Sequence, residues 1–331
     1  MRRDFEDFLL YKHANDGASD RTICAYRDIL ARFERWLDGR DPWTLSDDEV
    51  LTFTGPYLFK VLKLQPVSRT PYVACIRGLY AWHASLYGSR NCAARVPYPK
   101  SGRRLPRAMN LDHAERIMWS PNFATFEGVR DAAMLALLIG CGLRVSGLCG
   151  LNQSNIVPMQ IQGEQRLAVK TREKGNKERL IPIPLEADLL LRAYLAHPDL
   201  EEIPRELKNG DRVLFVTTRN RKCPAHEYYG EKRRFGRQGV NVMIARHGKT
   251  ANIPKDELHP HALRHLFGAE LAEDDVDLLL RQLLLGHADA SSAEIYSHLA
   301  IRKLTRTTDK ANPLAKMKTP ASKLLEQLRG K

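Results

Sequence analysis

The sequence predicts a mainly α-helical protein of two domains, with a small antiparallel β-sheet in the second domain. Its 331 residues are more than one hydrophobic core usually organises, which favours two domains over one. Through most of the chain, apolar residues recur at spacings of three and four, as they do along the buried face of a helix. One short stretch instead reads as a hairpin, because two strand-like runs flank the turn residues Gly175-Asn176.

Residues 1–89 are expected to form a compact bundle of four short helices, the first of which opens the chain. The second spans residues 20–39, with its apolar side chains on one face. The third, residues 45–62, should bend or break at Gly55-Pro56, since proline has no backbone N–H to donate. The fourth spans residues 68–88. Arginines outside such a bundle suit nucleic acid, and a helical dimerisation module is the alternative.

Residues 90–109 are predicted to form a basic linker. No acidic residue occurs from 90 to 107, whereas lysine, arginine and proline are frequent. Proline favours an extended path, and a basic strap of this kind suits a chain that wraps around a duplex. A solvated linker without a DNA contact is the alternative. The basic residues are Arg90, Arg95, Lys100, Arg103, Arg104 and Arg107.

Residues 110–300 are predicted to form the second, larger domain. Its first long helix, Val129–Leu143, is apolar after its first turn, so it should be buried and stop near Gly142. Two strands, Arg166–Thr171 and Glu178–Pro184, should follow as a hairpin, with Val213–Thr217 as a third strand. The other helices are expected at residues 114–118, 145–151, 185–195, 240–247, 261–273, 276–285 and 291–299. A basic tail, residues 301–331, follows the domain.

Charge and cysteine content limit the class of protein. The formal net charge is +13 and the pI about 9.5, so a polyanion is the expected partner, most commonly nucleic acid. A merely basic protein is the alternative. The six cysteines form no CxxC pair, and the longest apolar run, Ala132–Leu143, is too short to cross a bilayer. We therefore expect reduced thiols, no membrane segment and a cytoplasmic location at the nucleoid.

Two arginines stand where they can bind a phosphate. Arg144 follows the end of the buried helix at once, which makes a rigid mount. Arg264 comes three residues after His261, so both face the same way on one helix. A planar guanidinium binds two phosphate oxygens and stabilises the charge of the transition state. His261 and His265 also have the spacing of a zinc helix, but the arginine between them disfavours a cation, so no metal is expected.

Four further side chains complete a set suited to phosphate chemistry. Lys174, in the hairpin turn, can donate a proton to a leaving oxygen, with Lys177 as its competitor. Tyr296 is the candidate nucleophile, because a phosphotyrosyl ester conserves the energy of the broken bond without ATP. His261 and His287 can take or share the tyrosine proton, or bind a phosphate oxygen. Each residue alone also has a structural interpretation, as a salt bridge, an exposed turn residue or a packed ring.

In order and local context these residues resemble the conserved boxes of the tyrosine recombinase (phage integrase) family. RDAAMLALLIGCGLRVS at 130–146 looks like the first arginine box, and KGNKER at 174–179 like the lysine hairpin. HALRH at 261–265 is similar to the HxxR box, and LGHADASSAEIYSH at 285–298 to the box of the second histidine and the tyrosine. The bundle of residues 1–89 resembles the core-type DNA-binding domain of the family.

The resemblance implies a compact Xer-like or mobile-element integrase that recombines DNA at specific sites. Tyr296 would attack the scissile phosphate, leaving a 3′-phosphotyrosyl link and a free 5′-hydroxyl. The two arginines and two histidines would hold the phosphate, and Lys174 would protonate the leaving 5′ oxygen. No metal or nucleotide would be required. The two domains would clamp double-stranded DNA, four copies of the chain would form the synapse, and the tail after Tyr296 would dock on a neighbouring copy.

Two features depart from a simple member of this family. Gly147 stands where many members carry an acidic residue that supports the arginine. The stretch from Lys174 to His261 is long, so residues 219–239 are expected to add a DNA or protein contact. Two rival functions remain: a type IB topoisomerase, which uses the same tyrosine chemistry on one duplex, and a DNA-binding protein that keeps the fold without the reaction.

Overall fold

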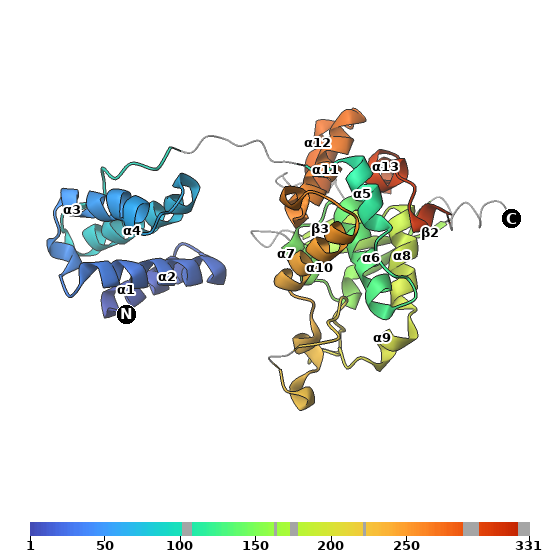
Figure 1. Cartoon of the computed structure of the whole chain (residues 1–331), viewed down its shortest axis with the longest axis horizontal. Helices are drawn as coiled ribbons and strands as arrows, with labels where there is room; N and C mark the ends of the chain where they lie inside the picture. Colours follow the sequence, from blue (N-terminus) through green and yellow to red (C-terminus); the bar gives the residue numbers. More distant parts are fainter. Residues whose placement is uncertain (101–107, 162–163, 173–177, 221–222, 287–297, 324–331) are drawn as a thin grey trace. The chain divides into compact units, whose positions relative to one another are not determined.

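The computed structural model shows a chain of two compact units, Met1–Arg104 and Leu105–Lys331, each built around its own hydrophobic core (Figure 1). It describes residues 1–100, 108–161, 164–172, 178–220, 223–286 and 298–323. The described part is mainly helical, with one small antiparallel sheet in the second unit, as the sequence predicts. Among these residues, no helix is both long and apolar enough to cross a membrane.

The first unit is a helical bundle. The third predicted helix was expected to bend or break at Gly55-Pro56. In the structure a short α-helix is followed there by a π-helical segment that contains Pro56. Proline cannot donate the usual backbone hydrogen bond, so the wider helix accommodates it without ending the element. The bundle consists of α1 (Arg3–Ala14), α2 (Asp20–Leu37), α3 (Asp47–Thr52), the π-helical segment Phe53–Val61 and α4 (Pro66–Tyr87).

The bundle continues into the segment that the sequence assigned to the linker. Cys92, Ala93 and Val96 are buried in the core of the first unit, and the backbone oxygen of Val96 accepts a 2.6 Å hydrogen bond from Arg77. Arg90 forms an ion pair with Asp47 at 2.9 Å. Small apolar residues between the charges therefore anchor the first part of this segment, and the predicted start at residue 90 is too early. Residues 101–107 lie outside the described residues.

The second unit is organised around α6 (Phe126–Gly140), which lies among α5 (Leu111–Met118), α8 (Leu185–Leu195) and α11 (Pro260–Glu273) (Figure 1). Every α6 residue except Glu127 is buried, as expected for a helix whose residues from Ala132 onward are all apolar. The helix ends where Gly142 adopts a left-handed conformation, with φ +56°. The next helix, α7 (Val145–Cys149), begins directly after Arg144.

The sheet has the strand order β1-β2-β3, with both pairs antiparallel. Its strands are β1 (Ile156–Ile161), β2 (Glu164–Arg172) and β3 (Glu178–Pro182). The predicted hairpin is β2 with β3, whereas the prediction of a third strand at Val213–Thr217 was wrong, since that segment makes only isolated bridges. β1 takes that place at the sheet edge, where its internal proline, Pro158, is tolerated.

After α8, the chain forms a short α9 (Pro198–Glu202) and an irregular segment before α10 (Arg237–Thr250). Residues 219–239, the predicted extra contact, fall largely in this segment. Tyr228 orders part of it: its hydroxyl donates to the backbone oxygen of Thr217 at 2.7 Å, and the Arg233 guanidinium lies 3.7 Å from the centre of its ring. A role in DNA or protein binding stays a prediction for these residues.

Towards the end of the described chain come α12 (Leu278–Leu285), α13 (His298–Ala311) and a short 3-10 helix, Pro313–Lys316. The tail beyond residue 302 packs on its own unit: Leu304 and Leu314 are buried, and Asp309 pairs with Arg166 of β2 at 2.7 Å. The predicted domain end near residue 300 is thus not a boundary of the core. Docking on a neighbouring copy stays a prediction, and residues 324–331 lie outside the described part.

Candidate active site

Arg144 occupies the junction between the buried helix α6 and α7. It is the residue that precedes the first turn of α7, and its backbone is extended, with φ −67° and ψ 144°. Its side chain is half-buried, and burial lowers the pKa of its guanidinium. The buried helix before it fixes the position of this residue, as the sequence pattern predicts.

Arg264, one turn into α11, is buried and hydrogen-bonds to the ends of two other helices. Its guanidinium donates to the backbone oxygens of Gly142, at the end of α6, and Leu285, at the end of α12. Burial, and then the charges of Arg179 and Arg144, lower its pKa to about 9. The side chain therefore brings a positive charge into a poorly hydrated place that is already positive, which is the electrostatic condition for binding an anion.

His261 lies three residues before Arg264, and both side chains line the same pocket. Its pKa is lowered by burial first, and then by the positive charges of neighbouring groups, Arg264 and Arg144 among them. A histidine of this kind is neutral at physiological pH, so it can accept a proton or a hydrogen bond.

Arg179, a residue of the hairpin motif KGNKER for which the sequence predicted no role, joins this cluster. It lies on β3 and donates a 2.5 Å hydrogen bond to the backbone oxygen of Leu284. Burial, followed by the charge of Arg144, lowers its pKa to about 10. In the sequence, only its position two residues after the hairpin turn pointed to a place near the site. Its nearness to the end of α12 and to Arg144 follows from the tertiary structure. The site thus contains a third guanidinium.

Arg144, His261 and Arg264 line one pocket of about 460 Å³, together with His265, Gly268, Ala269 and Leu285. Leu285 and Gly286 end α12, with Gly286 in a left-handed conformation at φ +66°. The chain continues from there into His287 and Tyr296. These two residues and Lys174 lie outside the described residues, so the structure brings together three of the six predicted site residues and leaves the other three untested.

Gly147 packs closely against the sheet. A Cβ on this residue would lie 3.0 Å from the hydroxyl oxygen of Thr171, on β2. An open pocket of about 260 Å³ adjoins it, lined by Ser146 and Lys170 among others. None of the residues that line this pocket is acidic, so no other carboxylate among them takes the place of the acidic side chain that many family members have at the position of Gly147. Close packing on β2 holds the start of α7 instead.

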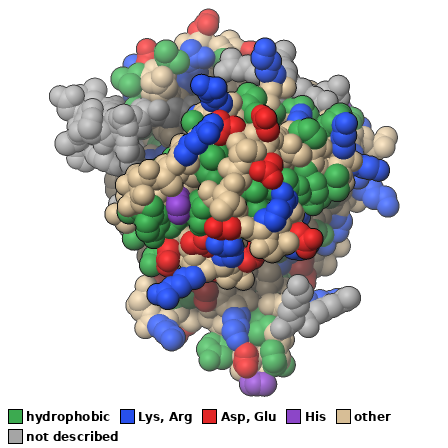
Figure 2. Space-filling model, turned by 90° about the vertical axis from the view of Figure 1, so that its left-hand side faces the viewer, with side chains coloured by type: hydrophobic (Ala, Val, Ile, Leu, Met, Phe, Trp, Pro, Cys, Tyr) green, Lys and Arg blue, Asp and Glu red, His purple; other side chains and the backbone are tan. Residues whose placement is uncertain are grey.

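The face drawn in Figure 2 carries charged side chains of both signs. On the face drawn in Figure 2, Lys and Arg side chains are interspersed with acidic and apolar ones. The net charge of +13 does not show as a single patch on this face, and the cluster of guanidinium groups at the pocket is the more specific signal.

Comparison with known proteins settles the family. The model of the phage integrase family matches residues 107–302, which is more than half of the chain. The chain belongs to the phage integrase family. This tyrosine recombinase is 31% identical to the tyrosine recombinase XerD of Listeria innocua, over 94% of this chain and 98% of that protein. It is 28% identical to the tyrosine recombinase XerC of Thermodesulfovibrio yellowstonii, over 94% of this chain and 96% of that protein.

Solved structures show the same fold. The XerH recombinase bound to a palindromic difH substrate, in a post-cleavage complex, aligns with a TM-score of 0.64 at 17% identity, covering 92% of this recombinase and 82% of that chain. A lambda integrase tetramer bound to a Holliday junction aligns with a TM-score of 0.60, also at 17% identity, covering 88% and 79%. The predicted combination of helices with a small antiparallel sheet is thus that of known recombinases.

Proposed function

We propose that this recombinase cuts and rejoins double-stranded DNA at specific sites through a 3′-phosphotyrosyl intermediate. The observation that carries the proposal is the pocket in which Arg144, His261 and Arg264 meet, with Arg179 as a neighbour. It is concave and positively charged, and Leu285, at the end of α12, is one of its lining residues. Such a pocket suits one phosphate of a DNA strand.

In this mechanism the hydroxyl oxygen of Tyr296 attacks the scissile phosphorus, and the bond to the 5′ oxygen breaks. Lys174 gives a proton to the leaving oxygen, and a neutral histidine, His261 or His287, takes the tyrosine proton. Arg144 and Arg264 stabilise the charge on the non-bridging oxygens. Attack by the 5′-hydroxyl of a second strand reverses the step. The number of phosphoester bonds is conserved, so the exchange needs no ATP, and the guanidinium groups supply the charge stabilisation for which other enzymes use a metal ion.

The active form is proposed to be a homotetramer that holds two duplexes in a synapse, in the cytoplasm at the nucleoid. The lambda integrase tetramer on a Holliday junction supports this assembly, because its fold is shared by this chain. The Xer relatives, which align along nearly their whole length, support site-specific recombination over relaxation of a single duplex. All six candidate residues are present, which argues against a non-catalytic DNA-binding protein.

A nicked suicide substrate tests the chemistry. We expect wild-type protein, mixed with a pool of nicked duplexes of randomised sequence, to form a denaturant-resistant adduct, because the cut fragment diffuses away before religation. Tyr296→Phe should abolish the adduct while retaining DNA binding in a gel-shift assay. Tyr229→Phe, at an exposed tyrosine of the same unit, is the matched control and should still form the adduct, because it leaves the nucleophile in place. An adduct formed by Tyr296→Phe would point to another nucleophile and refute the proposal.

A further inference from the structure

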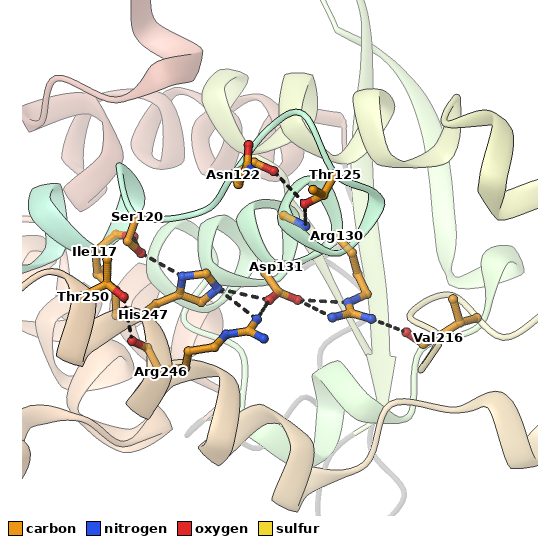
Figure 3. Close-up of polar contacts among 11 residues, drawn as sticks. Ile117, Ser120, Asn122, Thr125, Arg130, Asp131, Val216, Arg246, His247 and Thr250 are labelled. Carbon is orange, nitrogen blue, oxygen red and sulfur yellow. Dashed lines mark hydrogen bonds and ion pairs between the residues drawn. The ribbon is translucent and has the colours of Figure 1, made fainter. Parts of the chain in front are cut away.

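A buried carboxylate joins α6 to α10. Asp131 of α6 is fully buried, and its two oxygens contact three cationic or proton-donating side chains (Figure 3). One oxygen accepts hydrogen bonds from Nε and Nη2 of Arg130, at 2.9 and 2.7 Å. The other accepts from Nη2 of Arg246 and, at 3.0 Å, from Nε2 of His247. Asp131 thus fixes the place of two consecutive residues of α10.

The partners of Asp131 differ in what else they do. Arg130 is buried: its Nη1 donates to the backbone oxygen of Val216 at 3.0 Å, and its guanidinium lies 4.6 Å from the centre of the Phe235 ring. His247 is also buried, and its Nδ1 lies 2.9 Å from the hydroxyl of Ser120 (Figure 3). The side chains of Arg130 and His247 are therefore engaged in contacts within the protein and are not accessible to a ligand. Arg130 alone already balances the charge of Asp131.

Arg246 is different, because 60% of its side chain is exposed. It uses Nη2 to reach Asp131, and within the described residues its Nε and Nη1 donate no hydrogen bond. With Arg130 neutralising the carboxylate, the second guanidinium leaves the group with a net positive charge at the surface. An exposed arginine normally loses side-chain entropy when it binds a phosphate, and the anchor on Asp131 removes much of that cost in advance.

The surroundings of Arg246 suit a polyanion. The sequence of α10, RQGVNVMIARHGKT, contains no acidic residue. Lys249, three residues on, is exposed and shares a side of the helix with Arg246. Arg237 begins the same helix and is exposed too. No carboxylate on this helix therefore competes with a phosphate for the free guanidinium nitrogens.

We propose that Arg246 is a contact to the DNA backbone, held in a binding-ready position by the buried carboxylate of Asp131. The partner is a phosphate group of duplex DNA, which the outward Nε and Nη1 meet while Nη2 stays on Asp131. Asp131 is a positioning residue that acts through Arg246. The inference rests on the proposed function for its ligand, since it adds a DNA contact that lies outside the pocket of Arg144 and Arg264.

The test measures affinity for duplex DNA against salt concentration, using the full-length chain. Arg246→Ala should weaken binding about tenfold, as expected for the loss of a charge-assisted hydrogen bond, and lower the slope of log K against log salt by about 0.9. The loss should be equal for duplexes of unrelated sequence, because a phosphate contact carries no base information. Arg246→Lys should recover only part of the affinity, since an ammonium cannot reach Asp131 and a phosphate with separate nitrogens.

Lys249→Ala is the matched control, because it removes an exposed cation from the same helix that has no hydrogen bond to a buried carboxylate among the described residues. It should weaken binding less than Arg246→Ala. Asp131→Asn should weaken binding in the wild-type background and have no further effect on binding in Arg246→Ala. If Asp131→Asn does not fold, the comparison of Arg246→Ala with Lys249→Ala decides alone.

Wild-type affinity and slope in Arg246→Ala would overturn the inference, and so would a loss confined to one DNA sequence. A purely structural role predicts a lower melting temperature with an unchanged salt slope, which also overturns it. The adduct assay separates the two proposals. Adducts from wild type together with unchanged binding by Arg246→Ala defeat the Arg246 contact alone. Duplex binding without any adduct defeats the proposed function and leaves the Arg246 result valid.

Discussion

At the scale of the residue, the pocket is defined by positive groups that lower one another's pKa. The charges that act on Arg264 among the described residues are those of Arg179 and Arg144, both positive. A folded protein tolerates such repulsion when a bound anion relieves it, which favours a phosphate site over a structural ion pair. The described hydrogen bonds of Arg264 reach backbone oxygens, which orient the guanidinium without neutralising it.

His261 gives a prediction about pH. Burial, and then the neighbouring positive charges, hold its pKa below the ordinary value of 6.5. The unfolded chain therefore binds this proton more tightly, so acidification below about pH 6.5 should remove stability, and raising the pH through that window should restore it. We expect the NMR titration of the His261 ring to have its midpoint below 6.5.

Arg264→Gln should move that midpoint upward, because it removes one of the repelling charges. Arg219→Gln, at an exposed arginine that does not line the pocket, serves as the control and should leave the midpoint in place. An identical midpoint in Arg264→Gln and wild type would show that His261 does not sense the guanidinium.

At the scale of the element, the end of α6 decides where Arg144 stands. Gly142 has φ +56°, and a Cβ there would lie 2.3 Å from a ring carbon of Phe267 on α11. Its backbone oxygen also accepts the hydrogen bond of Arg264. One turn of chain thus combines a left-handed backbone, a close helix contact and a hydrogen bond to the site.

We predict that Gly142→Ala lowers the free energy of unfolding by about 2–4 kcal/mol, through backbone strain together with overpacking. It should also slow adduct formation on the suicide substrate, because α11 and Arg264 must shift. Gly210→Ala is the matched control: φ is +80°, but nothing lies within 4 Å of its Cβ. It should cost about 1 kcal/mol from strain alone and leave the adduct rate unchanged. Urea denaturation measures the free energy of unfolding of both variants. Equal losses in both variants would contradict the packing argument.

At the scale of the whole molecule, two units with separate cores are joined by a basic segment. Part of that segment is already committed to the first unit, where Arg90 pairs with Asp47. Arg103, Arg104 and Arg107 follow later in the segment, and a DNA contact stays a prediction for them. If this basic segment also binds the duplex, it adds phosphate contacts to those of the two units.

Replacing Arg103, Arg104 and Arg107 together by alanine should lower the salt slope of duplex binding by about 2.7, at 0.9 for each phosphate contact. Thermal unfolding should not change. Arg90→Ala, whose charge is already paired, is the control and should alter the slope much less. Fluorescence anisotropy with a labelled duplex gives the slopes, and an unchanged slope in the triple variant would mean that the linker stays off the DNA.

Much of the architecture follows from local patterns. The four-helix bundle, the buried helix α6, the β2–β3 hairpin and α11 were all predicted, because their periodicity, caps and turn residues lie within a few positions of one another. The wrong prediction at Val213–Thr217 has the same origin. A short apolar run is compatible with a strand, but whether it joins the sheet depends on partners far away in the chain.

The sequence by itself determined the family and the candidate residues, since each motif is a short run whose order along the chain carries the information. Only the tertiary structure decided that Arg179 stands beside Arg264, that Asp131 anchors Arg246, and that the tail through Lys316 pairs with Glu270 of α11. These contacts join residues 46 or more positions apart. The physical reason is that they form only when helices pack, and packing follows the shape and burial of whole elements.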